Sequence, residues 1–408
     1  MTRYSLEDRL RHGRVTTKLR LHDCLDLVTN AQMRRHEKFS QGRSSDRPPK
    51  NSLNAAARRI YNPIGFSRFY NFVLWALFGF ILARAAYMNF NGVFCGGNLK
   101  YGAAPGECPS YKGHYKFGII MHLVTIFPAG FLVLFQFIPA IRHHVILFHR
   151  INGYAIVLLV LFSNAGALSK LYLPTSLART WTNNITVAAR VAFGGTLSTQ
   201  MWVGFVAIIT TLSLVLAWIN IKRLQIDQHR IWMLRAWFYL ASVITERLIA
   251  LAAQPIIKSI GSYVYAMRCS KIVGIMTTYG IPAQAARGFY PACVPFLNGQ
   301  GDPYAVVQAG GLGRPEQIAA ALSVSFGACL WLALMINAIG IEIYISLTPR
   351  EHERLRQVSY ERQQEAGMSH AGSSGLTADR FGDSEPWRPI QKYSVKGREN
   401  SVEEEQEK

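Results

Sequence analysis

Six apolar stretches, each close to the length of a bilayer crossing, dominate this chain. They lie at 68–89, 116–139, 149–171, 196–221, 231–253 and 318–346. A transmembrane helix needs about 20 mostly apolar residues, because each residue adds only about 1.5 Å along the helix axis. A soluble domain accommodates one such helix in its core, but not six. The sequence therefore predicts an all-α integral membrane protein with a bundle of about six transmembrane helices.

The charged residues divide the chain into three parts. Only 17% of the 408 residues are charged, and most of these lie near the two ends. We expect residues 1–66 to be a basic, largely flexible cytosolic tail, and residues 67–347 to form the transmembrane domain. Residues 348–408 should be a cytosolic helix followed by a disordered acidic tail.

The start of that last helix has a recognisable pattern. Thr348 is placed to cap it, Pro349 suits its first position, and Glu351 is placed to return the capping bond. We expect the helix to end near Ala366.

The distribution of positive charge predicts the orientation. The short connections 140–148 and 222–230 are dense in Arg and Lys, whereas the longer connections 90–115, 172–195 and 254–317 carry their charges thinly. Short basic loops stay in the cytosol, so both termini should be cytosolic, in the plasma membrane or a secretory-pathway or vacuolar membrane. The net charge of +20 then reflects contact with the lipid bilayer. Because no motif that reads DNA or RNA is present, we expect no nucleic acid partner.

Features of the long connections agree with an outer location. Asn184 begins a glycosylation sequon, and four cysteines are candidates for disulfides in an oxidising lumen: Cys95, Cys108, Cys269 and Cys293. The sequence does not choose among their three pairings, and unpaired thiols are the alternative. Cys24 and Cys329 should stay unbridged. The connection 254–317 is long enough to fold as a cap, within which 255–277 is either a re-entrant segment or a weak seventh span.

Polar side chains at membrane depth are costly and are therefore candidates for function. Six lie in the outer half of the predicted spans: Arg84, His122, Asn164, Gln200, Glu246 and Arg247. If their helices are neighbours, these residues line a pocket for a small-molecule ligand. In the structural alternative, Glu246 neutralises Arg84 or Arg247, and His122 is a hydrogen-bonded core histidine.

Two histidines at the cytosolic ends of different spans form a second candidate site. His149 and His229 are the minimum needed to ligate a b-type haem, and imidazole is a strong axial ligand. Arg150, Arg230 and Arg235 would then meet the haem propionates. In the alternative, these residues anchor the helices at the lipid headgroups, beside Trp232 and Trp237. The sequence has no zinc-protease motif, phosphate loop or nucleophile elbow, and we predict no metal site.

The order of these motifs resembles a family of predicted membrane proteins of fungi and bacteria that is labelled only as a domain of unknown function. The resemblance covers roughly residues 65–250. It rests on His122, then His-Arg-x-x-Gly, then Asp-x-His-Arg-x-Trp-Met-x-Arg, and it points to His122, His149, Arg150, Gly153, His229, Arg230, Trp232 and Arg235. The connection 254–317 is an insertion relative to the compact bacterial form. No activity of this family is secure, so the resemblance supports only the fold and the choice of residues.

Three functions are therefore open, and whether the chain is an enzyme is left undecided. The first is transmembrane redox transfer to a redox partner through haem b at His149 and His229. The second is transport or reception of a small molecule in the outer pocket around Glu246. The third is an accessory or scaffold role that depends on the cytosolic tails.

Overall fold

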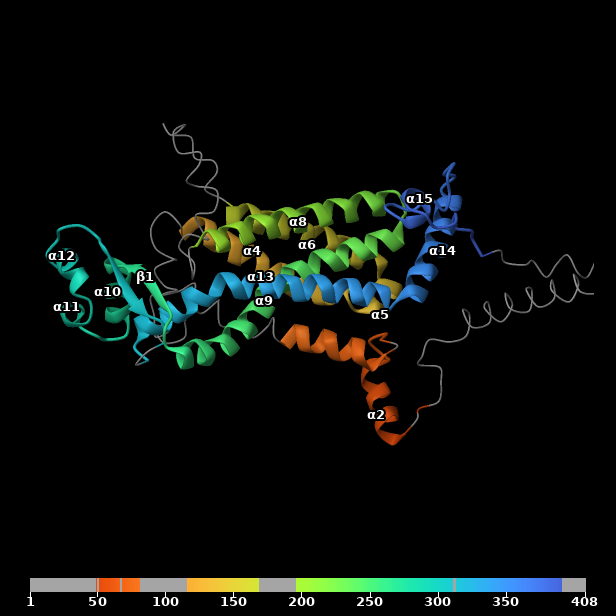
Figure 1. The fold of residues 1–408 in the computed structure, drawn as a ribbon. Helices are drawn as coiled ribbons and strands as arrows, with labels where there is room; N and C mark the ends of the chain where they lie inside the picture. The colour runs from red at the N-terminus through yellow and green to blue at the C-terminus, as the bar shows by residue number, and fades with distance from the viewer. Residues whose placement is uncertain are drawn as a thin grey trace, which may run out of the picture. The chain divides into compact units, whose positions relative to one another are not determined.

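The computed structural model describes residues 49, 51–66, 68–80, 116–168, 196–310 and 313–390, and most of them are helical (Figure 1). The chain divides into two compact units. Met1–Phe80 with Val133–Asn152 form the first unit, and Ile81–Leu132 with Gly153–Lys408 form the second.

The first unit is built around an aromatic cluster. It contains α2 (Ser52–Tyr61), an apolar helix Phe69–Phe80, the end of α4 (Lys116–Gln136), α5 (Pro139–His144) and the start of α6 (Ile146–Leu168). The ring of Trp75 lies 5.7 Å from that of Phe66, and its indole N–H donates to the carbonyl of Leu134. Gly65 has φ +90°, and a Cβ there would lie 2.7 Å from the backbone nitrogen of Ala140, so this approach requires glycine.

Three long helices of the second unit lie side by side (Figure 1): α8 (Leu197–Lys222), α9 (Ile226–Ile260) and α13 (Pro315–Ser346). Trp202 and Val206 of α8 pack with Leu330 and Leu334 of α13 in a small buried core. The three-residue turn between α8 and α9 makes these two helices antiparallel neighbours.

Within the part of the chain that the structure describes, four helices are long and apolar enough to cross a membrane, namely α6, α8, α9 and α13. The shorter apolar helices Phe69–Phe80 and Ile120–Gln136 fall within the first two predicted spans. The outward faces of the long helices carry exposed Leu and Ile, which suits contact with lipid better than contact with water. The described residues are thus mostly helical and hold four candidate spans, and the full set of six remains a prediction.

Residues 263–310 fold as a cap at one end of α9 and α13. The cap contains β1 (Val264–Arg268), α10 (Cys269–Thr278), η5 (Ala283–Ala285), α11 (Ala286–Phe289), η6 (Pro291–Cys293), α12 (Val294–Leu297) and β2 (Tyr304–Gln308). The strands pair antiparallel, with Val264 opposite Gln308 and Arg268 opposite Tyr304. A disulfide joins Cys269 to Cys293, two of the four cysteines whose pairing the sequence leaves open.

The stretch 255–277 is therefore not a seventh spanning helix. It contains the end of α9, all of β1 and most of α10. Lys258, Arg268 and Lys271 within it are consistent with this result, because three charges would be costly inside a bilayer.

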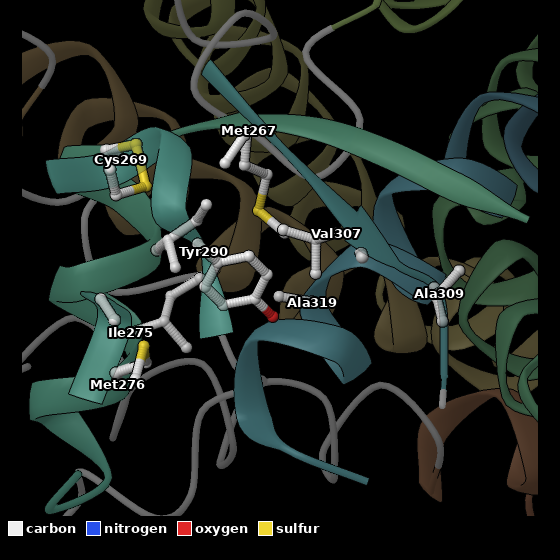
Figure 2. Packing of buried hydrophobic residues seen from close by; sticks show 14 of the residues in the cluster. Met267, Cys269, Ile275, Met276, Tyr290, Val307, Ala309 and Ala319 are labelled. Carbon is white, nitrogen blue, oxygen red and sulfur yellow. A yellow bond between two sulfur atoms is a disulfide. The ribbon is translucent and has the colours of Figure 1, made fainter. Parts of the chain in front are cut away.

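Tyr290 lies at the centre of the cap core, against Met267, Ile275 and Val307 (Figure 2). Its hydroxyl donates to Glu316 at 3.0 Å, and Arg314 donates to the same carboxylate at 2.7 Å. Burial and the negative charge of Glu316 raise the pKa of Tyr290 to about 12. This polar contact joins the cap to the start of α13.

The chain after α13 is ordered further than its sequence indicates. The predicted polar helix is α14 (Pro349–Glu365), with Pro349 at its first position. Thr348 does not cap it, however, because its hydroxyl donates to the carbonyl of Tyr344 and accepts from Arg230. Residues 366–390, which we expect from the sequence to belong to a disordered tail, instead pack back over α14 and include α15 (Ala378–Phe381). We call α14 together with residues 366–390 the C-terminal platform.

Candidate functional site at the polar end of the second unit

A buried carboxylate anchors the C-terminal platform to the membrane helices. Asp227 lies in the first turn of α9, where the helix dipole favours a negative charge, and it is fully buried. Its Oδ1 lies 3.1 Å from the hydroxyl of Ser359 in α14, and its Oδ2 accepts from the hydroxyl of Ser374 at 2.5 Å. The backbone N–H of Ile226 donates to Ser359 as well. One side chain thus joins the start of α9 to both parts of the platform.

Further hydrogen bonds hold the platform to the α8–α9 turn. Gln225 donates to the carbonyl of Ser373 at 2.9 Å, and Gln363 donates to the carbonyl of Arg223 at 3.0 Å. A Cβ at Gly375 would lie 2.6 Å from Oδ1 of Asn220 in α8. The platform backbone therefore approaches α8 as closely as a glycine permits.

An ion pair and an aromatic ring fix the returning segment on α14. Both terminal nitrogens of Arg356 donate to Asp379, at 3.0 and 2.5 Å, and the guanidinium lies 4.8 Å from the centre of the Trp387 ring. These hydrogen bonds lower the pKa of Asp379 to about 2. The indole N–H of Trp387 donates to Glu353 at 2.9 Å.

A cavity of about 400 Å³ lies between α9 and the platform. It is lined by Gln228, Ile231, Arg235, His352, Arg356, Leu376, Thr377, Ala378, Asp379, Ser384, Glu385 and Trp387. The lining contains charges of both signs, an aromatic ring and few aliphatic side chains. Nε of Arg356 and Nδ1 of His352 are buried with no hydrogen-bond partner among the described residues. Such a surface suits a polar ligand that supplies hydrogen bonds.

Three residues of the predicted haem site lie at this end of the bundle, each with protein partners. Nδ1 of His229 lies 2.9 Å from the carbonyl of Ala217 in α8. Arg230 donates to Thr348, and Arg235 makes a two-point ion pair with Glu342 of α13 at 2.7 and 2.9 Å. Both arginines therefore join α9 to the C-terminal end of α13, Arg235 within that helix and Arg230 just after it.

The other two predicted haem residues belong to the first unit. His149 is half-buried in α6, where its carbonyl accepts from Gln136, and Arg150 is exposed. His149 and His229 thus lie in different units, and their pairing across one haem remains a prediction. No group of three or more metal-binding side chains occurs in the part of the chain that the structure describes.

The predicted outer-pocket residues join neighbouring helices in pairs. Nδ1 of His122 in α4 lies 2.8 Å from the hydroxyl of Ser163 in α6. Asn164, the next residue of α6, donates to Thr210 and Thr211 of α8 at 3.3 and 3.1 Å. Hydrogen bonds of this kind hold helices together inside a bilayer, as the structural alternative predicts for His122.

Glu246 is the most deeply buried of the pocket residues that the structure describes. It is 1% exposed, and its Oε2 lies 3.5 Å from Nε of Arg247, as the structural alternative predicts. Gln200 is half-buried in α8. Arg84, Asn184, Cys95, Cys108 and Cys24 lie outside the described residues, so the predictions made for them stand as they are. Cys329 is buried in α13 and unbridged, as predicted.

Sequence reasoning missed the residues that hold the platform. Asp227 is part of the string that carries the family resemblance, but its position gives no sign of its partners. Ser359 and Ser374 lie 132 and 147 residues away along the chain, in a segment whose composition is typical of a tail. A single buried polar contact leaves no periodic signal in a sequence.

No family model, curated protein or solved structure matches the chain. The resemblance to a family of unknown function therefore remains a proposal.

Proposed function

We propose that the chain is a multi-pass membrane protein of the accessory or scaffold class, which binds a protein partner at its cytosolic end through the C-terminal platform. The observation that carries this proposal is the fully buried Asp227, which holds residues 349–390 against the helix ends. Ordering a polar segment costs conformational entropy of about 1–2 kcal/mol per residue. A tail that served only to solubilise the chain would need no such anchor.

The cavity beside the platform favours a peptide over a small apolar ligand. Its lining includes the cations Arg235 and Arg356, the acids Asp379 and Glu385, and the ring of Trp387. Trp and Arg are enriched where proteins recognise one another, and mixed charge suits a polar peptide segment. The partner would thus insert a short polar segment between α9 and the returning chain.

The disulfide in the cap supports placing the platform in the cytosol. Cys269–Cys293 favours an oxidising environment around the cap. The cap and the platform are joined to opposite ends of α13, so a crossing by α13 puts the platform on the other side. This orientation agrees with the basic short loops.

The proposal is tested by changing the cavity without disturbing its anchor. Glu385 lines the cavity and is exposed, so Glu385→Arg should reverse the local charge while the platform stays docked. We expect the recovery of cross-linked partners from native membranes to fall at least about tenfold, because like charges placed across an interface repel each other. Hydrogen exchange of residues 366–390 checks that docking is unchanged.

Asp383→Arg is the matched control, because Asp383 is exposed on the same segment and does not line the cavity. Deletion of residues 367–408 should abolish partner recovery, while the His149→Ala/His229→Ala double variant should preserve it. Equal recovery from the deletion variant and the unaltered chain would refute the proposal.

Haem-linked redox transfer is the second candidate, and the geometry of His229 favours it. A ligating histidine usually donates one ring N–H to a carbonyl, which fixes the other nitrogen toward the metal. The contact between Nδ1 of His229 and Ala217 has this form and leaves Nε2 as the ligand atom. An absorption spectrum of the purified protein, supplied with haem and then reduced, decides the matter. A sharp reduced band that is lost in His229→Ala would establish haem binding, and a featureless spectrum would exclude it.

A further inference from the structure

Helix α2 turns its apolar side outward, which is the reverse of a helix on a soluble protein. Leu53, Ala56 and Ile60 are spaced at i, i+3 and i+7, so they form one stripe along the helix. Leu53 is 81% exposed and Ile60 is 63% exposed, and Ala56 between them is exposed too. A surface helix in water would bury this stripe.

The opposite side of α2 faces into the first unit. Tyr61, at the end of the helix, is 3% exposed and contacts the rings of Phe69 and Phe72. Oδ1 of Asn54 and Nε of Arg58 are buried on the same side. The helix is therefore held by its polar and aromatic side, and the apolar stripe is left for another surface.

We propose that α2 is an interfacial helix whose Leu53–Ala56–Ile60 face binds the headgroup region of an anionic cytosolic leaflet. Charge complementarity favours this occupant, because the exposed Arg59 lies next to Ile60 in the last turn of α2 and the first turn has no acidic residue. The orientation predicted from the basic short loops places α2 on the cytosolic side, where anionic lipids gather.

Two features of the first unit are consistent with α2 lying at the membrane surface and parallel to it. The apolar helix Phe69–Phe80 begins only eight residues after α2 ends, so α2 lies next to the point where that helix enters the bilayer. In Figure 1, α2 runs crosswise to that helix. A helix that lies across a membrane-spanning helix lies along the membrane surface, as amphipathic anchor helices do.

Hydrogen exchange of the full-length protein in nanodiscs tests this proposal. The amides of residues 52–61 should exchange more slowly in discs that contain phosphatidylserine than in discs of phosphatidylcholine alone. Removing one surface cation weakens binding to anionic lipid about fivefold, so Arg59→Gln should lower this added protection by a similar factor. Arg59→Lys keeps the charge and should leave the protection unchanged.

The apolar stripe is tested in the same discs. Leu53→Gln with Ile60→Gln should abolish the protection of α2 in both kinds of disc, whereas Leu53→Ile with Ile60→Leu should preserve it. Both positions are exposed, so neither change removes a buried contact. Unchanged exchange of the aromatic cluster around Trp75 checks that the unit stays folded.

Three results would overturn the proposal. If α2 is equally protected in both kinds of disc, and also in the Leu53→Gln/Ile60→Gln variant, then lipid does not cover it. Protection only in discs that hold two copies would assign the stripe to a second copy of the chain. Loss of protection after deletion of residues 1–48 would assign it to that segment instead.

Discussion

Asp227 determines whether the C-terminal platform stays docked. Its carboxylate accepts from Ser359 and Ser374, so Asp227→Ala leaves two buried hydroxyls without this partner. Ser359 keeps its hydrogen bond to the carbonyl of Leu355, so the penalty falls mainly on the buried hydroxyl of Ser374. Losing that acceptor costs about 1–3 kcal/mol, and the cost acts on docking rather than on the whole bundle. We expect the amides of residues 366–390 to exchange at least about tenfold faster in Asp227→Ala, while those of α9 beyond its first turn change little.

Asp383→Ala is the control for this prediction, since Asp383 is an exposed acid of the same segment. Equal exchange in the two variants would show that Asp227 does not anchor the platform.

His352 should make docking weaken in mild acid. Burial is the main cause that lowers its pKa below 6.5; the charges of Arg356 and Arg230 lower it further, and Asp227 and Glu353 oppose the shift. The undocked platform therefore binds more protons than the docked one below pH 6.5. Docking is at full strength above that pH and is lost as the pH falls toward the lowered pKa, by up to about tenfold per pH unit.

The measurement is the exchange rate of residues 366–390 between pH 7.5 and 5.5, corrected for intrinsic exchange. His352→Gln should remove the pH dependence, and the exposed His370→Gln should not. A profile that is identical in His352→Gln and the unaltered chain would contradict the assignment.

Among the elements, the cap depends most on a covalent link. Cys269 begins α10 and Cys293 ends η6, and both sulfurs are buried in the core around Tyr290 (Figure 2). The Cys269→Ser/Cys293→Ser double variant should destabilise the cap by about 2–5 kcal/mol, as expected for a small domain that loses its disulfide. Exchange of β1, α10 and β2 should accelerate, with little change in α8.

Cys329→Ser is the control, because Cys329 is an unbridged thiol outside the cap. If the cap of the Cys269→Ser/Cys293→Ser variant exchanges as slowly as that of the unaltered chain, the cap core is held by packing alone.

The sequence predicts the apolar helices well, but it does not predict which polar residues contact one another. A bilayer demands about 20 apolar residues per crossing, and this demand leaves a signal that Leu197–Lys222 and Pro315–Ser346 carry plainly. The pairing of Asn164 with Thr210 needs only two polar residues at the right depth on adjacent helices, so the sequence indicates the candidates but not the partners. The contact between Asp227 and Ser374 depends on how distant segments meet, which composition and periodicity do not encode.

At the scale of the whole molecule, the cap and the platform should lie on opposite sides of the membrane. α13 begins at the cap and ends at the platform, and it is long and apolar enough to cross a bilayer. The disulfide favours the oxidising side for the cap, and the basic short loops favour the cytosol for the platform. The disulfide and the basic loops are independent features of the chain, and both favour the same orientation.

Glycan acceptor sites test this orientation directly. Asn298 is exposed in the cap and is followed by Gly299 and Gln300, so Gln300→Thr creates a sequon there. We expect the variant to gain one endoglycosidase-sensitive glycan, and adding Asn298→Gln to this variant should remove it. We also expect an epitope placed after Lys408 to be digested only by protease added on the cytosolic side. A glycosylated cap with a cytosolic epitope would support a crossing by α13. An unmodified cap together with an epitope digested from the outer side would reverse the orientation, and the interfacial helix and the platform would then both face the lumen.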